Sequence, residues 1–196
     1  MKASIANVAI RGLGKYSQSR FHETAKLSGE SHEDYDKRTW REHLHLSSAG
    51  MIIIPESAML QCIHSGVKYA GEKKKGQATW TKHFQGGLAM LEPAVTGVHS
   101  DAVTYEDIYS NSDGVRGSGK RVYRRFPILS PWSATFSVLI LDLEITKDVF
   151  TRHLEVAGRY RGIGRWRPEN GGQNGRFVVE ACDWQDNREL KSIARK

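Results

Sequence analysis

The chain has 196 residues, of which 39% are hydrophobic, and its 29 Lys and Arg against 22 Asp and Glu give a formal net charge of +7. This length suits a single domain with a sizeable core, and the positive charge favours a polyanionic partner. The isolated cysteines, Cys62 and Cys182, form neither a disulfide framework nor a zinc motif, and no apolar run reaches the roughly 18 residues of a membrane span. We therefore expect a soluble cytoplasmic protein without a signal peptide, membrane, metal or cofactor.

The first half of the chain predicts a strand, a short helix, a second strand and a longer helix. Residues 4–11 are β-prone and end at a Gly-Leu-Gly turn. Ser31 is placed to cap a helix that runs to about Leu44. Residues 51–54 have the composition of a buried strand, and Pro55 begins a helix with a stripe of Met59, Ile63 and Val67 that ends near Gly71.

The second half predicts basic loops between strands, followed by a helix and a closing strand. Residues 71–87 show no periodicity and are expected to form a loop, as are residues 109–120. Strands are expected at 88–91, 102–108, 121–126 and 132–145. Thr146 is a candidate N-cap for a helix that Gly158 closes, and residues 176–182 form the last strand.

This order of elements predicts an α+β fold, in which a ferredoxin-like or RNA-recognition-like split βαβ core carries a large loop-rich insertion. The core occupies a single domain, residues 1–183, with the insertion at about 71–120. A polar C-terminal tail follows at 184–196. An unrelated α+β sheet protein is the alternative.

Positive charge is concentrated in three glycine-bearing segments. Residues 71–84 hold four lysines against one glutamate, residues 109–126 hold five basic groups against one aspartate, and residues 158–177 hold five arginines against one glutamate. Segments of this kind are expected to converge on one binding surface. The last segment also holds six glycines and three aromatics, a mixture typical of a nucleic-acid-binding loop, although an exposed turn with ordinary surface arginines has the same composition.

These segments supply the candidate binding residues. Arginine forks pair with phosphates, lysines extend the groove, and aromatic faces stack on bases. Trp80 and Phe84 either stack on bases or anchor their loop to the core, and Trp166 either stacks on a base or packs beneath its loop. The candidate nucleic-acid-binding set is Arg20, Lys73, Lys74, Lys75, Trp80, Lys82, Lys120, Arg121, Arg159, Arg161, Arg165, Trp166, Arg167 and Arg176.

The carboxy-terminal pattern resembles a known superfamily. It consists of Phe126-Pro127, the strand from Trp132, a helix, Gly162-Ile163-Gly164-Arg165-Trp166-Arg167-Pro168 and then Gly175-Arg176-Phe177. This pattern is similar to the repeat-associated (RAMP-type) RNA-binding superfamily, which builds the backbone of CRISPR effector complexes, and to related phage and prophage proteins. The resemblance implies a ferredoxin-like core that grips a nucleic-acid backbone, with copies arrayed along a strand or beside other effector subunits, in a bacterium or a phage-infected cell.

Other chemistry is poorly supported by the sequence. Residues 114–121 nearly match a phosphate-binding P-loop, but Arg121 stands where the motif needs Ser or Thr and a strand follows. His43 and His45 are close in sequence but are predicted to point apart, which argues against a metal site. Some members of the superfamily cleave RNA with a histidine near the amino terminus, so His22 is the one candidate general base.

The sequence thus predicts a non-enzymatic protein that binds the phosphate backbone of single-stranded RNA or DNA. A phage-encoded factor that binds a protein of a defence complex is the main alternative, and a metal-independent ribonuclease is the other. Phage replication or recombination roles remain open.

Overall fold

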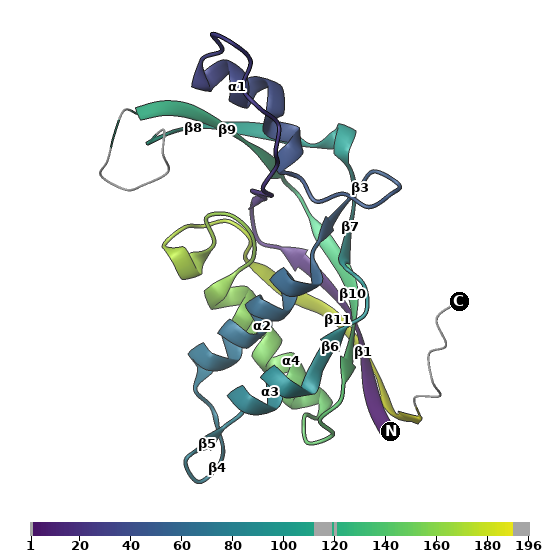
Figure 1. The fold of residues 1–196 in the computed structure, drawn as a ribbon. Helices are drawn as coiled ribbons and strands as arrows, with labels where there is room; N and C mark the ends of the chain where they lie inside the picture. Colours follow the sequence, from purple (N-terminus) through teal and green to yellow (C-terminus); the bar gives the residue numbers. More distant parts are fainter. Residues whose placement is uncertain (1, 112–118, 120, 190–196) are drawn as a thin grey trace.

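The computed structural model describes residues 2–111, 119 and 121–189, and its centre is an antiparallel sheet. The strand order is β11–β1–β10–β7–β3, with β6 also paired to β10. In the chain, a helix that covers the sheet lies between β1 and β7 (α2) and another lies between β10 and β11 (α4), so β11, β1, β10 and β7 have the 4-1-3-2 order of a split βαβ core (Figure 1). The bounds of these strands are Lys2–Gly12 (β1), Met51–Ile54 (β3), Leu88–Met90 (β6), Ala94–His99 (β7), Ser133–Ile140 (β10) and Phe177–Glu189 (β11).

The α+β fold class is therefore confirmed, but residues 71–120 are not one continuous insertion. Two strands inside this range belong to the main sheet, because Leu88 lies opposite Ile140 and Val95 lies opposite Thr135. Two insertions flank these strands. A small β4–β5 hairpin with helix α3 comes before them in the chain, and the long β8–β9 hairpin comes after them. The bounds of those elements are Lys73–Lys75 (β4), Ala78–Thr79 (β5), Thr81–Gly87 (α3), Thr104–Asn111 (β8) and Arg121–Leu129 (β9).

Two long helices cover one face of the main sheet (Figure 1). The first, α2, spans Glu56–Ala70, and the predicted stripe of Met59, Ile63 and Val67 is buried against the sheet. It ends at Gly71 in the left-handed conformation, with φ 58°. The second, α4, spans Lys147–Val156 and begins at Thr146, whose side chain accepts a hydrogen bond from the backbone N–H of Val149. Apolar periodicity and caps therefore determine both helices.

The helical conformation that begins with α4 does not end at Gly158 as predicted. It continues through a wider helical turn, η3, over Ala157–Arg161. This turn packs closely on α2, because a Cβ placed on Gly66 would come within 2.6 Å of the Cα of Ala157. The close contact fixes where the following glycine-rich loop starts.

A second, three-stranded sheet stands above the main one (Figure 1), in the order β2–β9–β8. Its third strand, β2, is only Tyr16–Ser17. The helix α1, His32–Thr39, lies against β9 and is continued by a 3-10 turn, η1, over Trp40–His43. Ser31 caps α1 as predicted, since its side chain accepts from the N–H of Asp34. An ion pair between buried Asp36 and Arg124 joins α1 to β9.

The lysine segment forms regular structure where a loop was predicted. Strands β4 and β5 pair across a turn at Gly76, which has φ 58°. Helix α3 then buries Phe84 completely, with its ring parallel to that of Phe150 at 6.5 Å. The sequence signal was weak because α3 has seven residues and ends in two glycines, so its stability comes from tertiary packing.

The last strand extends further than predicted, into the segment expected to be a polar tail. Strand β11 continues past Cys182 to Glu189, paired with β1 down to Lys2. Two further 3-10 turns, η2 at Ser100–Ala102 and η4 at Pro168–Asn170, complete the described elements. Among the residues that the structure describes, no helix has the length and apolar character needed to cross a membrane.

The contact between α2 and η3 gives a test of the fold. We expect Gly66→Ala to lower the free energy of unfolding by roughly 1–3 kcal/mol, because the new methyl group overpacks the interface with Ala157. Urea unfolding of the purified chain measures this change.

Gly86→Ala is the matched control, because Gly86 lies in α3 with nothing within 4 Å of its virtual Cβ. This variant should gain up to about 1 kcal/mol from helix propensity. Equal effects at the two glycines would contradict the close packing of α2 on η3.

Candidate nucleic-acid interface

The glycine-rich loop between η3 and β11 is tightly folded onto the short strand β2. The N–H of Arg165 donates to the carbonyl of Ser17 at 2.8 Å, and the N–H of Gly175 donates to the carbonyl of Lys15 at 2.7 Å. A Cβ on Gly175 would lie 1.8 Å from the carbonyl oxygen of Ile163. At Gly175 the missing side chain is therefore required by packing within the loop.

Glu169 is the hub of the loop's side chains. Its carboxylate accepts from Ser65 at 2.6 Å and from Nε of Arg167 at 2.7 Å, and it is also paired with Arg161. Nε of Arg161 donates to Ser65 as well, at 2.7 Å. Burial would raise the pKa of Glu169, but the hydrogen bonds from Ser65, Arg167 and Arg161 outweigh it and lower that pKa to about 2. Arg161 and Arg167 thus hold the loop in shape before they meet any ligand.

Arg165 connects the loop to the second sheet. Its guanidinium carbon lies 3.5 Å from the ring centroid of Phe126 and 4.4 Å from that of Trp166. Burial, together with the nearby charge of Arg124, lowers the pKa of Arg165 to about 10. The side chain is still a cation at neutral pH, and it contacts aromatic rings from two parts of the fold.

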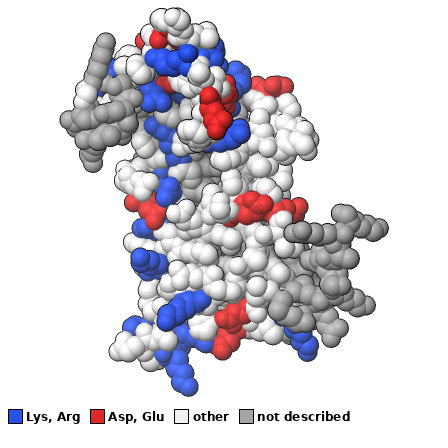
Figure 2. All heavy atoms as spheres, in the orientation of Figure 1, with Lys and Arg blue, Asp and Glu red and all other residues white. Residues whose placement is uncertain are grey.

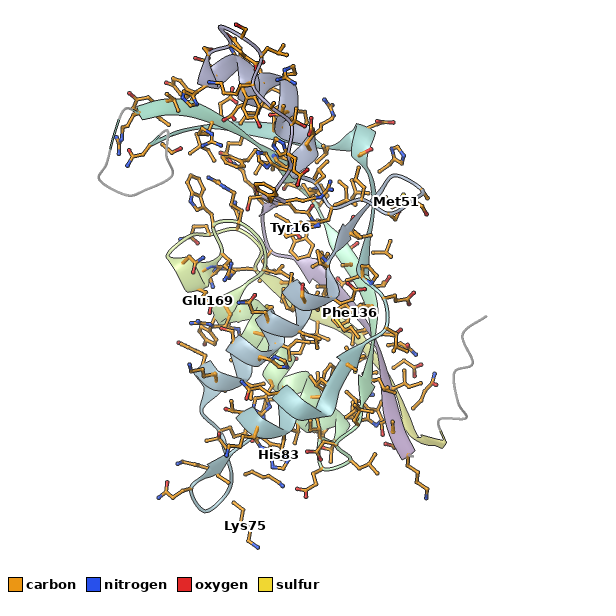
Figure 3. All side chains as sticks on the ribbon, viewed as in Figure 1. Tyr16, Met51, Lys75, His83, Phe136 and Glu169 are labelled. Atoms are coloured by element: carbon orange, nitrogen blue, oxygen red, sulfur yellow. The ribbon has the colours of Figure 1, made fainter. Side chains whose placement is uncertain are left out.

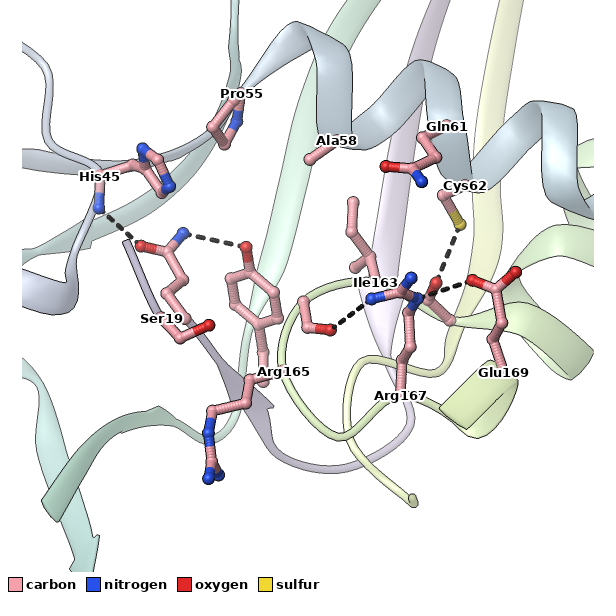
Figure 4. Close-up of a pocket in the computed structure, with 14 residues that line it drawn as sticks. Ser19, His45, Pro55, Ala58, Gln61, Cys62, Ile163, Arg165, Arg167 and Glu169 are labelled. Carbon is pink, nitrogen blue, oxygen red and sulfur yellow. Dashed lines mark hydrogen bonds and ion pairs between the residues drawn. The ribbon is translucent and has the colours of Figure 1, made fainter. Parts of the chain in front are cut away.

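An open cavity of about 210 Å³ lies between the loop, β2 and the start of α2 (Figure 4). Part of its wall is a hydrogen-bonded neutral cluster: the side chain of Gln18 donates to the hydroxyl of Tyr16 at 2.9 Å and accepts from the N–H of His45 at 2.7 Å. Cys62 donates to the carbonyl of Gly162 at 3.2 Å, and burial raises the pKa of its thiol to about 12, so this thiol is not a nucleophile. Arg165, Arg167 and Glu169 also line the cavity, and Arg167 is already paired with Glu169. The two guanidinium groups outnumber the single carboxylate, which favours a small anionic group such as a phosphate.

The three basic segments do not meet in this cavity. The glycine-rich loop lies midway along the molecule, Lys75 lies at one end on the β4–β5 hairpin, and the β8–β9 hairpin lies at the other (Figures 1 and 3). Figure 2 shows Lys and Arg side chains following one edge of the molecule between these ends. The predicted convergence is therefore replaced by a line of charge, which we call the basic edge; it includes the two hairpins and the glycine-rich loop.

The candidate residues differ in how freely they face solvent. Lys74 is paired with Glu144 and lies near Trp80, which is only 9% exposed and anchors its hairpin in the core. Arg176 donates to the carbonyl of Arg159. Trp166 is 43% exposed and has a positive φ of 56°. Exposed side chains among the candidates are Arg20, Lys73, Lys75, Lys82, Arg121 and Arg159, and Lys120 lies outside the described residues.

His22 has partners that the sequence did not reveal. Its Nδ1 lies 3.4 Å from Glu42, and its ring meets the edge of His43 at a centroid distance of 4.8 Å. The side chain is only 8% exposed, so this ring is a packing element of the second sheet and has little open surface for a substrate. Within the described part of the chain, no group of three or more His, Cys, Asp or Glu side chains is arranged to hold a metal ion.

The Glu169 hub predicts a pH-dependent contribution to stability. Because the pKa of Glu169 is lowered in the folded chain, the stability it contributes is present above about pH 4.5 and is lost as pH falls towards 2. Glu169→Gln should therefore cost roughly 1–3 kcal/mol at pH 7 by removing charge-assisted hydrogen bonds, and much less near pH 2.

Urea unfolding of both chains across this pH range measures the difference. Glu155→Gln, a change of the same type at an exposed position of α4, should leave stability nearly unchanged at every pH. A constant gap between the Glu169→Gln variant and the parent chain at all pH values would contradict the role of the carboxylate.

Comparison with known proteins finds likeness in structure alone. No protein-family model and no curated protein sequence matches the chain. A chain in the cryo-EM structure of the type III-B Cmr-beta complex bound to cognate target RNA aligns with a TM-score of 0.54 and 13% identity, over 94% of this chain. The crystal structure of Cmr6 from Pyrococcus furiosus aligns with a TM-score of 0.45 and 11% identity, over 90% of this chain and 98% of that one. This chain covers 61% of the Cmr-beta chain, and at this identity the likeness shows a shared fold.

Proposed function

We propose that the chain binds single-stranded nucleic acid by its phosphate backbone, along the basic edge. The observation that supports this most directly is the line of Lys and Arg between the two hairpins, with the glycine-rich loop between them (Figure 2). A net charge of +7 distributed in this way attracts an extended polyanion better than a compact one.

The glycine-rich loop supplies the fixed part of the proposed interface. Arg165 and Arg167 are held in place by Phe126 and Glu169, so their remaining N–H groups are positioned before a ligand arrives. The cavity beside them has room for a phosphate of a flexible strand. The exposed Lys73, Lys75 and Arg159 add cations that can meet further phosphates.

Two finer features of the proposal come from the resemblance to RAMP-type proteins and from the shared fold. The Cmr-beta chain belongs to an RNA-bound assembly, which supports RNA as the polymer to test first. We extend the proposal to assemblies in which copies of this chain bind side by side along one nucleic-acid strand, or beside other effector subunits. Mass measurements on oligonucleotides of increasing length distinguish such arrays, in which bound copies increase with length, from a single complex.

The phosphate contacts are tested by the salt dependence of binding. Fluorescence anisotropy with labelled single-stranded RNA, single-stranded DNA and duplex DNA gives the affinity at each salt concentration. Changing Lys73, Lys75 and Arg159 to Gln should weaken binding and reduce the slope of log K against log salt by about 2, since each phosphate contact on a single strand contributes about 0.7.

The matched control removes the same number of charges away from the basic edge. Lys2 and Arg11 lie on β1, and Lys147 lies near Trp184 of β11. Changing these three to Gln should leave the slope close to that of the parent chain. Equal slopes for the two triple variants would contradict binding along the basic edge. If the parent chain bound none of the three polymers, a protein partner would be favoured instead.

Binding is proposed to occur without cleavage of the strand. His22 has little exposed surface to act as a general base, and the Cys62 thiol is buried and kept protonated, so it is not placed to act as a nucleophile. Labelled RNA incubated with the protein should therefore be recovered at full length on a denaturing gel. Cleavage that His22→Ala abolishes would overturn this proposal in favour of a metal-independent ribonuclease.

A further inference from the structure

Two exposed tyrosines form a stacked pair on the helical side of the molecule. Tyr69 lies in the last turn of α2 and Tyr160 lies in η3, and their ring centroids are 5.2 Å apart with an interplanar angle of 29°. Tyr69 is 55% exposed and Tyr160 is 44% exposed. The pair therefore leaves much of its aromatic surface in water, which core packing does not explain.

The pair is held rigidly in this arrangement. It depends on the close packing of Gly66 against Ala157, which sets the position of η3 on α2. The guanidinium of Arg161 lies 5.5 Å from the ring centroid of Tyr69 and is itself fixed by Ser65 and Glu169. The tyrosines thus form a preorganised aromatic platform with a cation at its side.

The platform lies between two cationic parts of the basic edge. Arg159, which is exposed, precedes Tyr160 directly, and Arg161 follows it. On the other side, α2 ends at Ala70 and the lysine strand β4 begins at Lys73. A strand that runs from the glycine-rich loop towards the β4–β5 hairpin would pass the platform with phosphates near cations on both sides.

A similar combination occurs at another place on the basic edge. Tyr109 and Tyr123 face each other across the β8–β9 hairpin at 5.2 Å, and each is more than half exposed. The guanidinium of Arg121 lies 5.6 Å from the ring centroid of Tyr109. Half-exposed tyrosine pairs, each flanked by an arginine, therefore lie on either side of the glycine-rich loop. Repeated sites of this kind favour a ligand with repeated aromatic groups, such as the bases of a single-stranded nucleic acid.

We infer that Tyr69 and Tyr160 form a base-stacking site for single-stranded nucleic acid. This inference rests on the proposed function, and it adds a contact to the bases that phosphate binding alone does not supply. A nucleobase stacks on the exposed face of the pair, while Arg159 and Arg161 face the adjoining phosphates. Stacking of this kind accepts any base, so the site contributes affinity without sequence preference.

The test uses single-stranded RNA that carries the fluorescent base 2-aminopurine, whose emission is quenched when it stacks on an aromatic ring. The double variant Tyr69→Leu/Tyr160→Leu should bind about 10-fold more weakly than the parent chain and lose the quenching. Its salt slope should not change, because no charge is removed. Tyr69→Phe/Tyr160→Phe should bind and quench like the parent chain, because the rings remain.

Phe21→Leu controls for the loss of an aromatic side chain elsewhere, since Phe21 is 81% exposed in the segment that precedes α1. Equal urea midpoints for the parent chain and for Tyr69→Leu/Tyr160→Leu establish that the double variant keeps the fold. Parent-like affinity and quenching in Tyr69→Leu/Tyr160→Leu would overturn the base-stacking site and leave phosphate binding in place. A parent chain that binds no single strand at all would overturn both.

Discussion

The attachment of the glycine-rich loop to β2 is the interaction on which the rest of the interface depends. Two backbone hydrogen bonds, from Arg165 to Ser17 and from Gly175 to Lys15, join the loop to β2 of the second sheet and to the residue just before it. Backbone hydrogen bonds at this point fix the two sheets relative to each other, and they form one wall of the cavity. Without them, neither Arg165 nor Trp166 would have a defined position.

Charge within the loop serves structure first, and only the part left unpaired is available for the proposed binding. Glu169 neutralises part of the charge of Arg161 and Arg167, so the loop is less positive than its five arginines suggest. This arrangement avoids the repulsion of several unpaired guanidinium groups at close range, and it fixes the direction of those that remain open. The long-range attraction of a polyanion then comes mainly from the exposed cations of the hairpins. Salt screens these cations more strongly than the partly buried arginines of the loop.

The sequence predicted those parts of the fold that local signals determine. Ser31 and Thr146 cap helices as expected, and the stripe of Met59, Ile63 and Val67 is buried as expected. Where distant residues decide the outcome, the sequence left the alternatives open, as at Phe84, or predicted the wrong structure, as in the C-terminal segment. Phe84 is buried by α4, and Trp184 and its neighbours in the polar tail are ordered by pairing with β1.

The same distinction holds for the candidate site. The pattern of arginines and glycines located the loop, but it could not show that Glu169 occupies the arginines or that Trp80 is buried. The tyrosine pair had no sequence signal, because Tyr69 and Tyr160 meet only through the packing of α2 on η3. Contacts of this kind depend on tertiary structure, whereas composition reports only the total charge of a segment.

The open face of the main sheet gives a last argument for placing the interface on the edge. Sheets of the RNA-recognition type stack bases on exposed aromatic side chains of their strands. Here the face opposite the helices carries a shallow groove lined by small side chains, including Asn7, Ala9 and Thr135, with the acidic Asp183 and Glu92 beside them. Small and acidic groups offer neither stacking surface nor attraction for phosphates. The exposed tyrosine pairs lie instead on the helices and on the β8–β9 hairpin, so a nucleic acid that follows this fold is expected to run along the helices and hairpins and to leave the sheet uncovered.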